Sequence, residues 1–125
     1  MSTKTILIVE DDESVRSGLK LLFEGEGYPV LVAKHGKEAI RILKKGSKFK
    51  LGLILLDFKM PVMDGPTFLL KLEQDHPELL LSTPIFIITA DDKDTHQVKI
   101  NTTGILKKPF DMDELFRIAA LYCGK

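Results

Sequence analysis

Four groups of polar residues come directly after short apolar runs, and their side chains are of types that bind metal ions and phosphate. The acidic run Glu10–Glu13 (EDDE) follows the first apolar run, and Asp57 follows the third. Thr89 comes after the fourth run, and Lys108 comes shortly after the fifth. If the fold brings these positions together, the resulting site combines carboxylates, a hydroxyl and an ammonium group.

This combination of side chains is suited to the transfer of a phosphoryl group onto a carboxylate. Carboxylate oxygens are hard ligands that suit Mg²⁺, and a metal leaves one carboxylate able to act as a nucleophile. A lysine supplies positive charge to a phosphoryl oxygen, and a threonine hydroxyl supplies a hydrogen bond. Phosphoryl transfer depends mainly on positioning and charge neutralisation, and this set provides both.

Each of these residues, taken alone, also has a structural explanation. Acidic residues at a strand-to-helix junction cap the helix and complement its dipole, which is our interpretation of Asp12 and Glu13. A single Asp, Thr or Lys at the end of a strand is commonly a turn residue or a solvated one. The functional hypothesis therefore depends on the convergence of the whole set at one place.

Five short apolar runs predict the strands that would position this set. The runs are continuous rather than alternating, which is typical of parallel strands covered on both faces. Because ligands bind at the carboxyl ends of the strands in open parallel sheets, the polar groups are expected to share one edge. The runs are Ile6–Val9, Val30–Ala33, Leu53–Leu56, Ile85–Ile88 and the weaker Ile105–Leu106.

Segments with helical spacing of apolar residues separate these runs. Asp64 and Pro66 favour the start of one helix, and Asp111 and Glu114 have capping-box spacing at the start of the last. The polar interval Asp91–Lys99 is predicted to hold a weaker helix. The alternation predicts an α/β fold, a doubly wound parallel sheet with helices on both faces, in a single domain over residues 1–125.

Composition excludes several other classes of protein. The chain has 18 basic and 18 acidic residues, so its net charge of zero gives no electrostatic basis for binding nucleic acid. No apolar run approaches the ~20 residues of a membrane helix, and the N-terminus does not look like a signal peptide. The single cysteine, Cys123, is typical of a reducing compartment. We therefore expect a cytoplasmic domain without membrane contact.

The sequence resembles the receiver domain of bacterial two-component response regulators, of the chemotaxis-regulator type, along essentially its whole length. The resemblance rests on four stretches in the family's order, of which D-x-x-M-P-x-x-D-G is highly specific. It implies a flavodoxin-like five-stranded sheet of strand order 2-1-3-4-5. The stretches are Ile6–Asp12 (ILIVEDD), Asp57–Gly65 (DFKMPVMDG), Thr89–Ala90 and Lys108–Phe110 (KPF).

The resemblance also implies roles for the residues of the site. Asp57 is implied to be the phosphoacceptor, Thr89 the switch hydroxyl, and Lys108 the contact to the phosphoryl group. The implied cofactor is Mg²⁺, with Mn²⁺ as a possible substitute. Its implied ligands are Asp11, Asp57, the backbone carbonyl of Lys59, and Glu10 through water.

The resemblance implies partners and an activity of the same kind. The phosphoryl donor would be a sensor histidine kinase or a histidine phosphotransfer protein. The signal would pass to a downstream effector protein or to a fused output domain, without direct binding of nucleic acid by this domain. The protein would not be an enzyme in the ordinary sense, since it would catalyse only its own phosphorylation and dephosphorylation.

Three other functions remain as alternatives. A Mg²⁺-dependent phosphohydrolase of the haloacid-dehalogenase type would need a second Asp two residues after the nucleophile, where this chain has Lys59. A flavodoxin-like nucleotide binder needs a phosphate-cradling loop after the first strand, where Glu10–Glu13 would repel phosphate. A degenerate receiver that acts only as an interaction module would not need intact acceptor, metal and lysine positions.

Two features depart from the family pattern. Ile105 stands where the family usually has Tyr or Phe, and the interval from Thr89 to Lys108, 19 positions, is shorter than usual. Both changes fall on the face through which receivers usually signal. Lys59 and Asp91, at family positions that flank the phosphoryl group, are expected to form an ion pair over the site.

Overall fold

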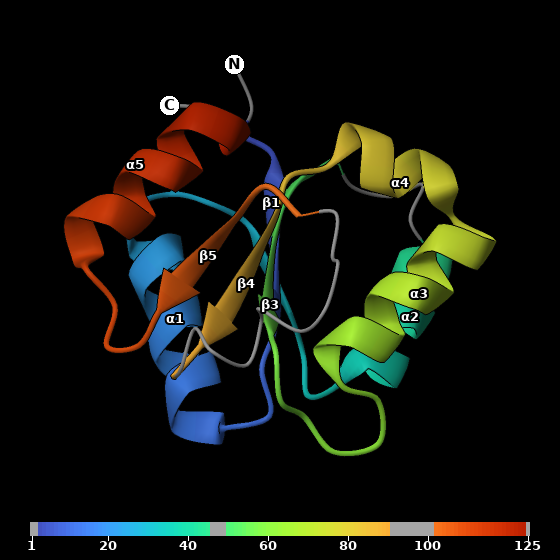
Figure 1. The fold of residues 1–125 in the computed structure, drawn as a ribbon. Coiled ribbons are helices and arrows are strands. Elements are labelled where there is room, and N and C mark those ends of the chain that lie inside the picture. Colours follow the sequence, from blue (N-terminus) through green and yellow to red (C-terminus); the bar gives the residue numbers. More distant parts are fainter. Residues whose placement is uncertain (1–2, 46–49, 91–101, 125) are drawn as a thin grey trace.

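The protein is a single parallel β-sheet with helices on both faces (Figure 1). The computed structural model describes residues 3–45, 50–90 and 102–124. The strands are β1 (Thr5–Val9), β2 (Val30–Ala33), β3 (Leu51–Asp57), β4 (Ile85–Thr89) and β5 (Gly104–Lys107). The helices are α1 (Glu13–Gly25), α2 (Gly36–Lys44), α3 (Gly65–Asp75), α4 (Pro77–Ser82) and α5 (Met112–Cys123).

The strand order is β2-β1-β3-β4-β5, with every neighbouring pair parallel, as predicted. In this register Ile8 of β1 lies between Val32 of β2 and Leu55 of β3. All five predicted strands are present. The central position of β3 places the residue at its carboxyl end in the middle of the sheet edge.

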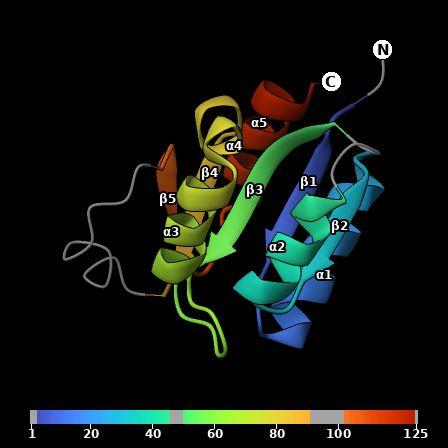
Figure 2. The ribbon, with the colours of Figure 1, turned by 90° about the vertical axis from the view of Figure 1, so that its right-hand side faces the viewer.

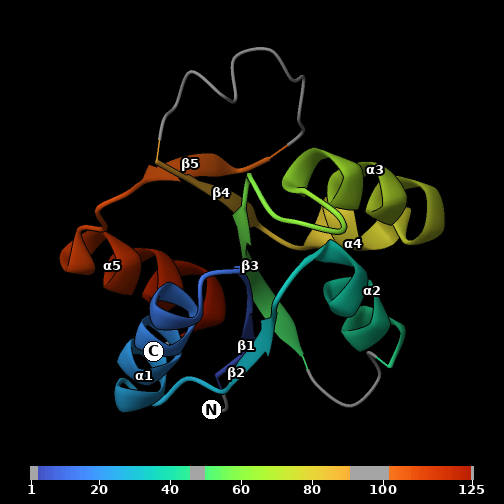
Figure 3. The same cartoon turned by 90° about the horizontal axis from the view of Figure 1, so that it is seen from below.

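The helices form one layer on each face of the sheet. Helices α1 and α5 cover one face, and α2, α3 and α4 cover the other (Figures 2 and 3). Alternate residues of β1 and β3 point into the two layers, so Ile8 and Leu55 pack under α1 and α5, whereas Leu7 and Leu56 pack under α2 and α3. Because both faces are covered, both sets must be apolar, which explains the continuous runs.

Asp residues cap three of the helices, as the sequence predicts. The side chain of Asp12 accepts a hydrogen bond from the Val15 N–H at 3.0 Å, and Asp64 accepts one from Thr67 at 3.0 Å. The Asp111 side chain accepts hydrogen bonds from the N–H of Asp113 at 2.9 Å and from the N–H of Glu114 at 3.4 Å. The capping interpretation of Asp12 is therefore confirmed.

The structure also differs from the prediction in its details. Strands β3, β4 and β5 each end on a polar residue that was expected to lie just beyond the strand. Asp57 of β3 pairs with Ile88 of β4, and Thr89 of β4 pairs with Lys107 of β5. The short helix α4 was not predicted, since six residues are too few to show a helical stripe. The predicted helix within Asp91–Lys99 lies outside the described residues. None of the described helices has the length and apolar character needed to cross a membrane.

Leu55 is expected to carry a large share of the core between β3 and the layer of α1 and α5. It is fully buried, so Leu55→Ala should lower the free energy of unfolding by about 2–5 kcal/mol through the cavity it leaves. Leu121, which is 71% exposed, is the matched control, and Leu121→Ala should cost less than about 0.5 kcal/mol. Urea unfolding followed by circular dichroism measures both. Equal losses would contradict this placement of Leu55.

Candidate functional site

A cleft of about 360 Å³ lies at the carboxyl ends of the strands and contains every site residue predicted from the sequence. Its walls come from the β1–α1 and β3–α3 connections, from Thr89 and Ala90 at the end of β4, and from Lys108 just after β5. The convergence on which the functional hypothesis depends is therefore confirmed. The lining residues are Glu10, Asp11, Asp12, Asp57, Lys59, Thr89, Ala90 and Lys108.

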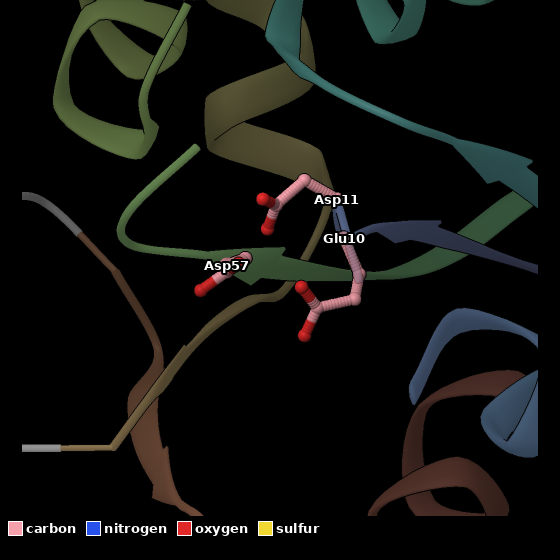
Figure 4. A group of neighbouring side chains, drawn as sticks. All are labelled: Glu10, Asp11 and Asp57. Carbon is pink, nitrogen blue, oxygen red and sulfur yellow. The ribbon is translucent and has the colours of Figure 1, made fainter. Parts of the chain in front are cut away.

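Three carboxylates meet in this cleft. Glu10, Asp11 and Asp57 each offer an oxygen, and these atoms all lie within 4.8 Å of one another (Figure 4). Glu10 is fully buried and Asp57 is 6% exposed, whereas Asp11 is exposed. Two like charges about 4 Å apart repel by roughly 4 kcal/mol at an effective dielectric constant near 20, so this arrangement requires either compensating positive charge or protonation of a carboxyl group.

Lys108 supplies part of that compensation by pairing with Glu10. Its Nζ lies 2.8 Å from Glu10 Oε1, and the backbone N–H of Asp12 donates to Glu10 Oε2 at 3.2 Å. Both oxygens of the buried carboxylate are therefore satisfied, which a buried charge requires. Lys108 was predicted to contact a phosphoryl group, and in this structure its ammonium group is bound to Glu10.

Arg16 is a further contributor that the residue pattern did not predict. Its Nη1 donates to the backbone carbonyls of Glu10 and Asp11, at 3.0 and 3.2 Å. These hydrogen bonds hold the β1–α1 turn and place a guanidinium group next to the acidic run. Residue spacing gave no signal for this contact, because the acceptors are main-chain atoms that any residue would supply.

The pKa of Asp57 is raised to about 8. Burial is the largest cause, followed by the hydrogen bond and the negative charge of Glu10 and by a hydrogen bond with Asp11, while Lys108 acts in the opposite direction. The net effect disfavours the ionised form of this carboxyl. A cation bound beside Asp57 would reverse that balance.

The pKa of Lys108 is raised as well. Burial on its own lowers the pKa of the ammonium group, but the hydrogen bond to Glu10 and the charges of Asp57, Glu10 and Asp11 outweigh burial. Lys108 therefore stays protonated at neutral pH and retains the positive charge that a phosphoryl group would need.

Gly65 allows the loop after Asp57 to fold back against the end of β3. A Cβ atom at residue 65 would lie 2.9 Å from the Asp57 carbonyl oxygen and 3.1 Å from Phe58 Cα, which are both rigid backbone atoms. The Gly65 N–H donates to the Phe58 carbonyl at 3.0 Å and closes the loop. The close approach explains the glycine of the D-x-x-M-P-x-x-D-G stretch and holds Lys59 beside the cleft.

Thr89 also lines the cleft, and backbone pairing holds it in place. It is 3% exposed at the end of β4, and its carbonyl accepts a hydrogen bond from the Lys108 N–H at 2.8 Å. The Lys108–Pro109 peptide bond is cis. Lys59 is exposed and lines the cleft, but its expected partner Asp91 lies outside the described residues.

The cleft has the donor set that a hard divalent cation requires. Because Lys108 already neutralises Glu10, the carboxylates of Asp11 and Asp57 are the two acceptors best placed to receive a bound cation. Carboxylate oxygens with room for water suit Mg²⁺, which usually keeps several of its waters. The residues present therefore fit the implied metal.

Comparison with known proteins agrees with the fold and identifies the family. A family model described as the response regulator receiver domain matches residues 6–120. The transcriptional regulatory protein CrdR of Helicobacter pylori is 36% identical over 115 residues, which are 90% of this chain and 51% of CrdR. The chain spans about half, or less, of the length of the curated relatives it matches.

Solved structures lead to the same family. The chemotaxis protein CheY4 of Vibrio cholerae is 26% identical and aligns over 97% of this chain and 99% of that chain, with a TM-score of 0.79. The Thermotoga maritima response regulator TrrA, solved in complex with Mg(2+)-BeF, is 26% identical over 91% of this chain and 94% of that chain, with a TM-score of 0.75. The chain belongs to the response regulator receiver domain family and is a signalling domain rather than a classical enzyme.

Mg²⁺ is expected to stabilise the protein through Asp11 and Asp57. At a concentration ten times its dissociation constant, one bound ion adds about 1.4 kcal/mol, which raises Tm by roughly 3–6 °C. Asp11→Asn should remove most of this gain. Differential scanning fluorimetry with and without Mg²⁺ measures it, and an identical response of the wild type and Asp11→Asn would place the metal elsewhere.

The same measurement should depend on pH in a defined direction. The folded pKa of Asp57, about 8, lies above the ordinary value near 3.9, so the metal-free fold loses stability as pH rises between these values. At pH 6 nearly every Asp57 side chain carries a proton that Mg²⁺ must displace, whereas at pH 8 a smaller fraction of them is protonated. The gain in Tm at a fixed Mg²⁺ concentration should therefore be larger at pH 8.

Proposed function

We propose that Asp57 accepts a phosphoryl group from a phosphohistidine of a partner protein. The observation that carries the proposal is the buried carboxylate of Asp57, which shares one cleft with Asp11, Thr89 and Lys108. We further propose that residues 1–125 act as a single receiver domain. The continuous sheet, covered by helices on both faces, supports this view.

The transfer needs little beyond placement of charge. An Asp57 carboxylate oxygen forms a bond to phosphorus as the bond between phosphorus and the donor's imidazole nitrogen breaks. The Lys108 ammonium would offset charge on one phosphoryl oxygen, and the Thr89 hydroxyl would donate a hydrogen bond to another. To do this, Lys108 must turn from Glu10 toward the phosphoryl group or contact both.

Mg²⁺, when bound, would offset negative charge on the phosphoryl oxygens. We propose Asp11, Asp57 and the backbone carbonyl of Lys59 as its direct ligands, with Glu10 acting through water. Mn²⁺, which also prefers oxygen ligands, would occupy the same set. The complex of TrrA with Mg(2+)-BeF supports this assignment by similarity.

The chemistry would be confined to the protein's own phosphorylation and dephosphorylation. Asp57, Thr89 and Lys108 lie on the chain that becomes modified, so no separate substrate would be turned over. A phosphohydrolase of the haloacid-dehalogenase type would need a carboxylate at position 59, where Lys59 stands. A domain used only for docking would not need a buried acceptor.

A second, apolar groove next to the cleft is a suitable docking place for the phosphohistidine donor. It has a volume of about 240 Å³ and lies between α1 and the start of α5. Asp12 and Lys108 line the cleft, and Ser14 and Phe110, two residues further along each segment, line the groove. A donor helix seated there would lie beside Asp57. The donor would be a sensor histidine kinase or a histidine phosphotransfer protein.

The state of Asp57 would then be passed to a downstream effector protein or a fused output domain. We place the domain in the cytoplasm, where its buried and unpaired Cys123 would stay reduced. Its net charge of zero argues against direct contact with nucleic acid. Ile105, at the family's usual aromatic position, is 47% exposed on β5 and would signal without an aromatic ring.

Acetyl phosphate with Mg²⁺ is expected to label the protein once, at Asp57. Asp57→Asn removes the anionic nucleophile with little change in volume and should abolish labelling. Asp12→Asn is the matched control, because asparagine caps a helix as well as aspartate does, and it should be labelled like the wild type. Intact-mass analysis gives the readout. Equal phosphate incorporation in Asp57→Asn would refute the assignment.

A bulky residue at position 18 is expected to block the donor's groove. A Cβ atom at Gly18 meets nothing within 4 Å, so Gly18→Leu should fold and fill the groove. It should slow phosphotransfer from the organism's purified histidine kinases at least about 10-fold, a loss of about 1.4 kcal/mol, without changing labelling by acetyl phosphate. Gly25→Leu, at the end of α1 outside the groove, is the control. Unchanged transfer to Gly18→Leu would mean that the donor docks elsewhere.

A further inference from the structure

A third groove, distinct from the two described above, lies between α2, α3 and the loop that follows Asp57. Helices α2 and α3 run side by side on the same face of the sheet (Figure 2). The groove has a volume of about 500 Å³. Its lining residues are Lys37, Ile40, Arg41, Lys44, Val62, Met63 and Lys71.

The rim of this groove is strongly basic. Lys37, Arg41 and Lys44 follow one another at i, i+4 and i+7, so they share one face of α2, and Lys71 faces them from α3. No carboxylate lines the groove within the described part of the chain. Lys71 is paired with Asp75 at 3.3 Å, so the three cations of α2 carry most of the positive potential.

This concentration of charge is local rather than general. The chain as a whole has no net charge, yet the groove carries four cations. Arg41 and Lys44 lie in the last turn of α2, where positive charge favours the helix, whereas Lys37 lies in the first turn and repels Arg41 at i, i+4. The close grouping of these cations makes the groove a local region of positive potential.

The floor of the groove is apolar, and one of its residues is held in an unfavourable conformation. Ile40 is buried and Met63 is half-buried, whereas Val62 is 74% exposed. Val62 has φ of 67°, in the left-handed region that β-branched residues rarely adopt. The loop therefore presents an apolar side chain to solvent, at the mouth of the groove, against its backbone preference.

The loop and α2 are tied together, so the groove has a defined shape. The N–H of Gly36 at the start of α2 donates to the Met63 carbonyl at 3.2 Å. A Cβ atom at Gly36 would lie 2.8 Å from Met63 Cγ, so the two segments are in close contact. Any occupant of the groove would touch the loop that leaves Asp57.

We propose that this groove docks an acidic peptide segment of a partner protein through an apolar side chain. The apolar residue would contact Ile40, Val62 and Met63, and flanking carboxylates would face the cations of α2 and α3. A nucleic acid fits less well, because an apolar floor offers nothing to a phosphate backbone. The proposal does not depend on phosphorylation of Asp57.

Selection of random displayed peptides on the intact protein tests the proposal directly and does not require an identified partner. The enriched peptides are expected to carry several Asp or Glu residues around a Leu, Ile, Met or Phe. Labelled with fluorescein and measured by anisotropy, they should bind less tightly as salt increases. Enrichment of basic or uncharged peptides, or no enrichment, would overturn the proposal.

Two sets of variants then locate the binding. Lys37→Glu combined with Arg41→Glu should weaken the selected peptides at least about 10-fold, whereas Lys20→Glu with Lys50→Glu, which alters exposed cations elsewhere, should change affinity less than about 2-fold. Val62→Gly should also weaken binding without lowering Tm, because glycine tolerates positive φ. Equal losses of peptide affinity in the two charge variants would overturn the proposal. It would also be overturned if an oligothymidylate bound more tightly than the peptides and lost affinity in the Lys37→Glu and Arg41→Glu variant.

Discussion

Burial of two acidic side chains at the ends of adjacent strands is the constraint on which the site depends. Val9 pairs with Leu56 in the sheet, so the next residues, Glu10 and Asp57, are brought side by side by the backbone register. Neither is exposed enough for water to screen the repulsion. The fold tolerates the pair because Lys108 neutralises Glu10 and because the raised pKa of Asp57 favours its uncharged form.

The strand order determines where that compensation comes from. Lys108 follows β5, which is separated from β1 by β3 and β4, and its ammonium group pairs with Glu10 at the carboxyl end of the sheet. Asp57 and Thr89, at the ends of the intervening strands, line the same cleft. The same geometry that neutralises Glu10 places the ammonium group close to the proposed acceptor. A phosphoryl group on Asp57 would compete with Glu10 for this one cation.

The sequence was sufficient for the five strands and for the convergence of the site, but not for the short helix α4 or for the contacts between distant side chains. Continuous apolar runs predicted all five strands because both faces of the sheet are covered, and Asp12, Asp64 and Asp111 cap the helices expected of them. Residue periodicity could not predict the pairing of Lys108 with Glu10 or the hydrogen bonds of Arg16, because these contacts join side chains to groups elsewhere in the chain. The basic groove was also missed, because its cations come from separate helices that look solvated when each is taken alone.

A crystal structure of the protein with Mg²⁺ and beryllofluoride would show whether Asp57 is the phosphoacceptor. Beryllofluoride mimics a phosphoryl group, and we expect it to bind a carboxylate oxygen of Asp57. Its fluorine atoms should contact the Thr89 hydroxyl and the Lys108 ammonium, and the metal should be bound by Asp11 and Asp57. Density for the mimic at another residue would contradict the role of Asp57 as acceptor. A Lys108 that stays bound only to Glu10 beside an occupied Asp57 would contradict its role as the phosphoryl contact.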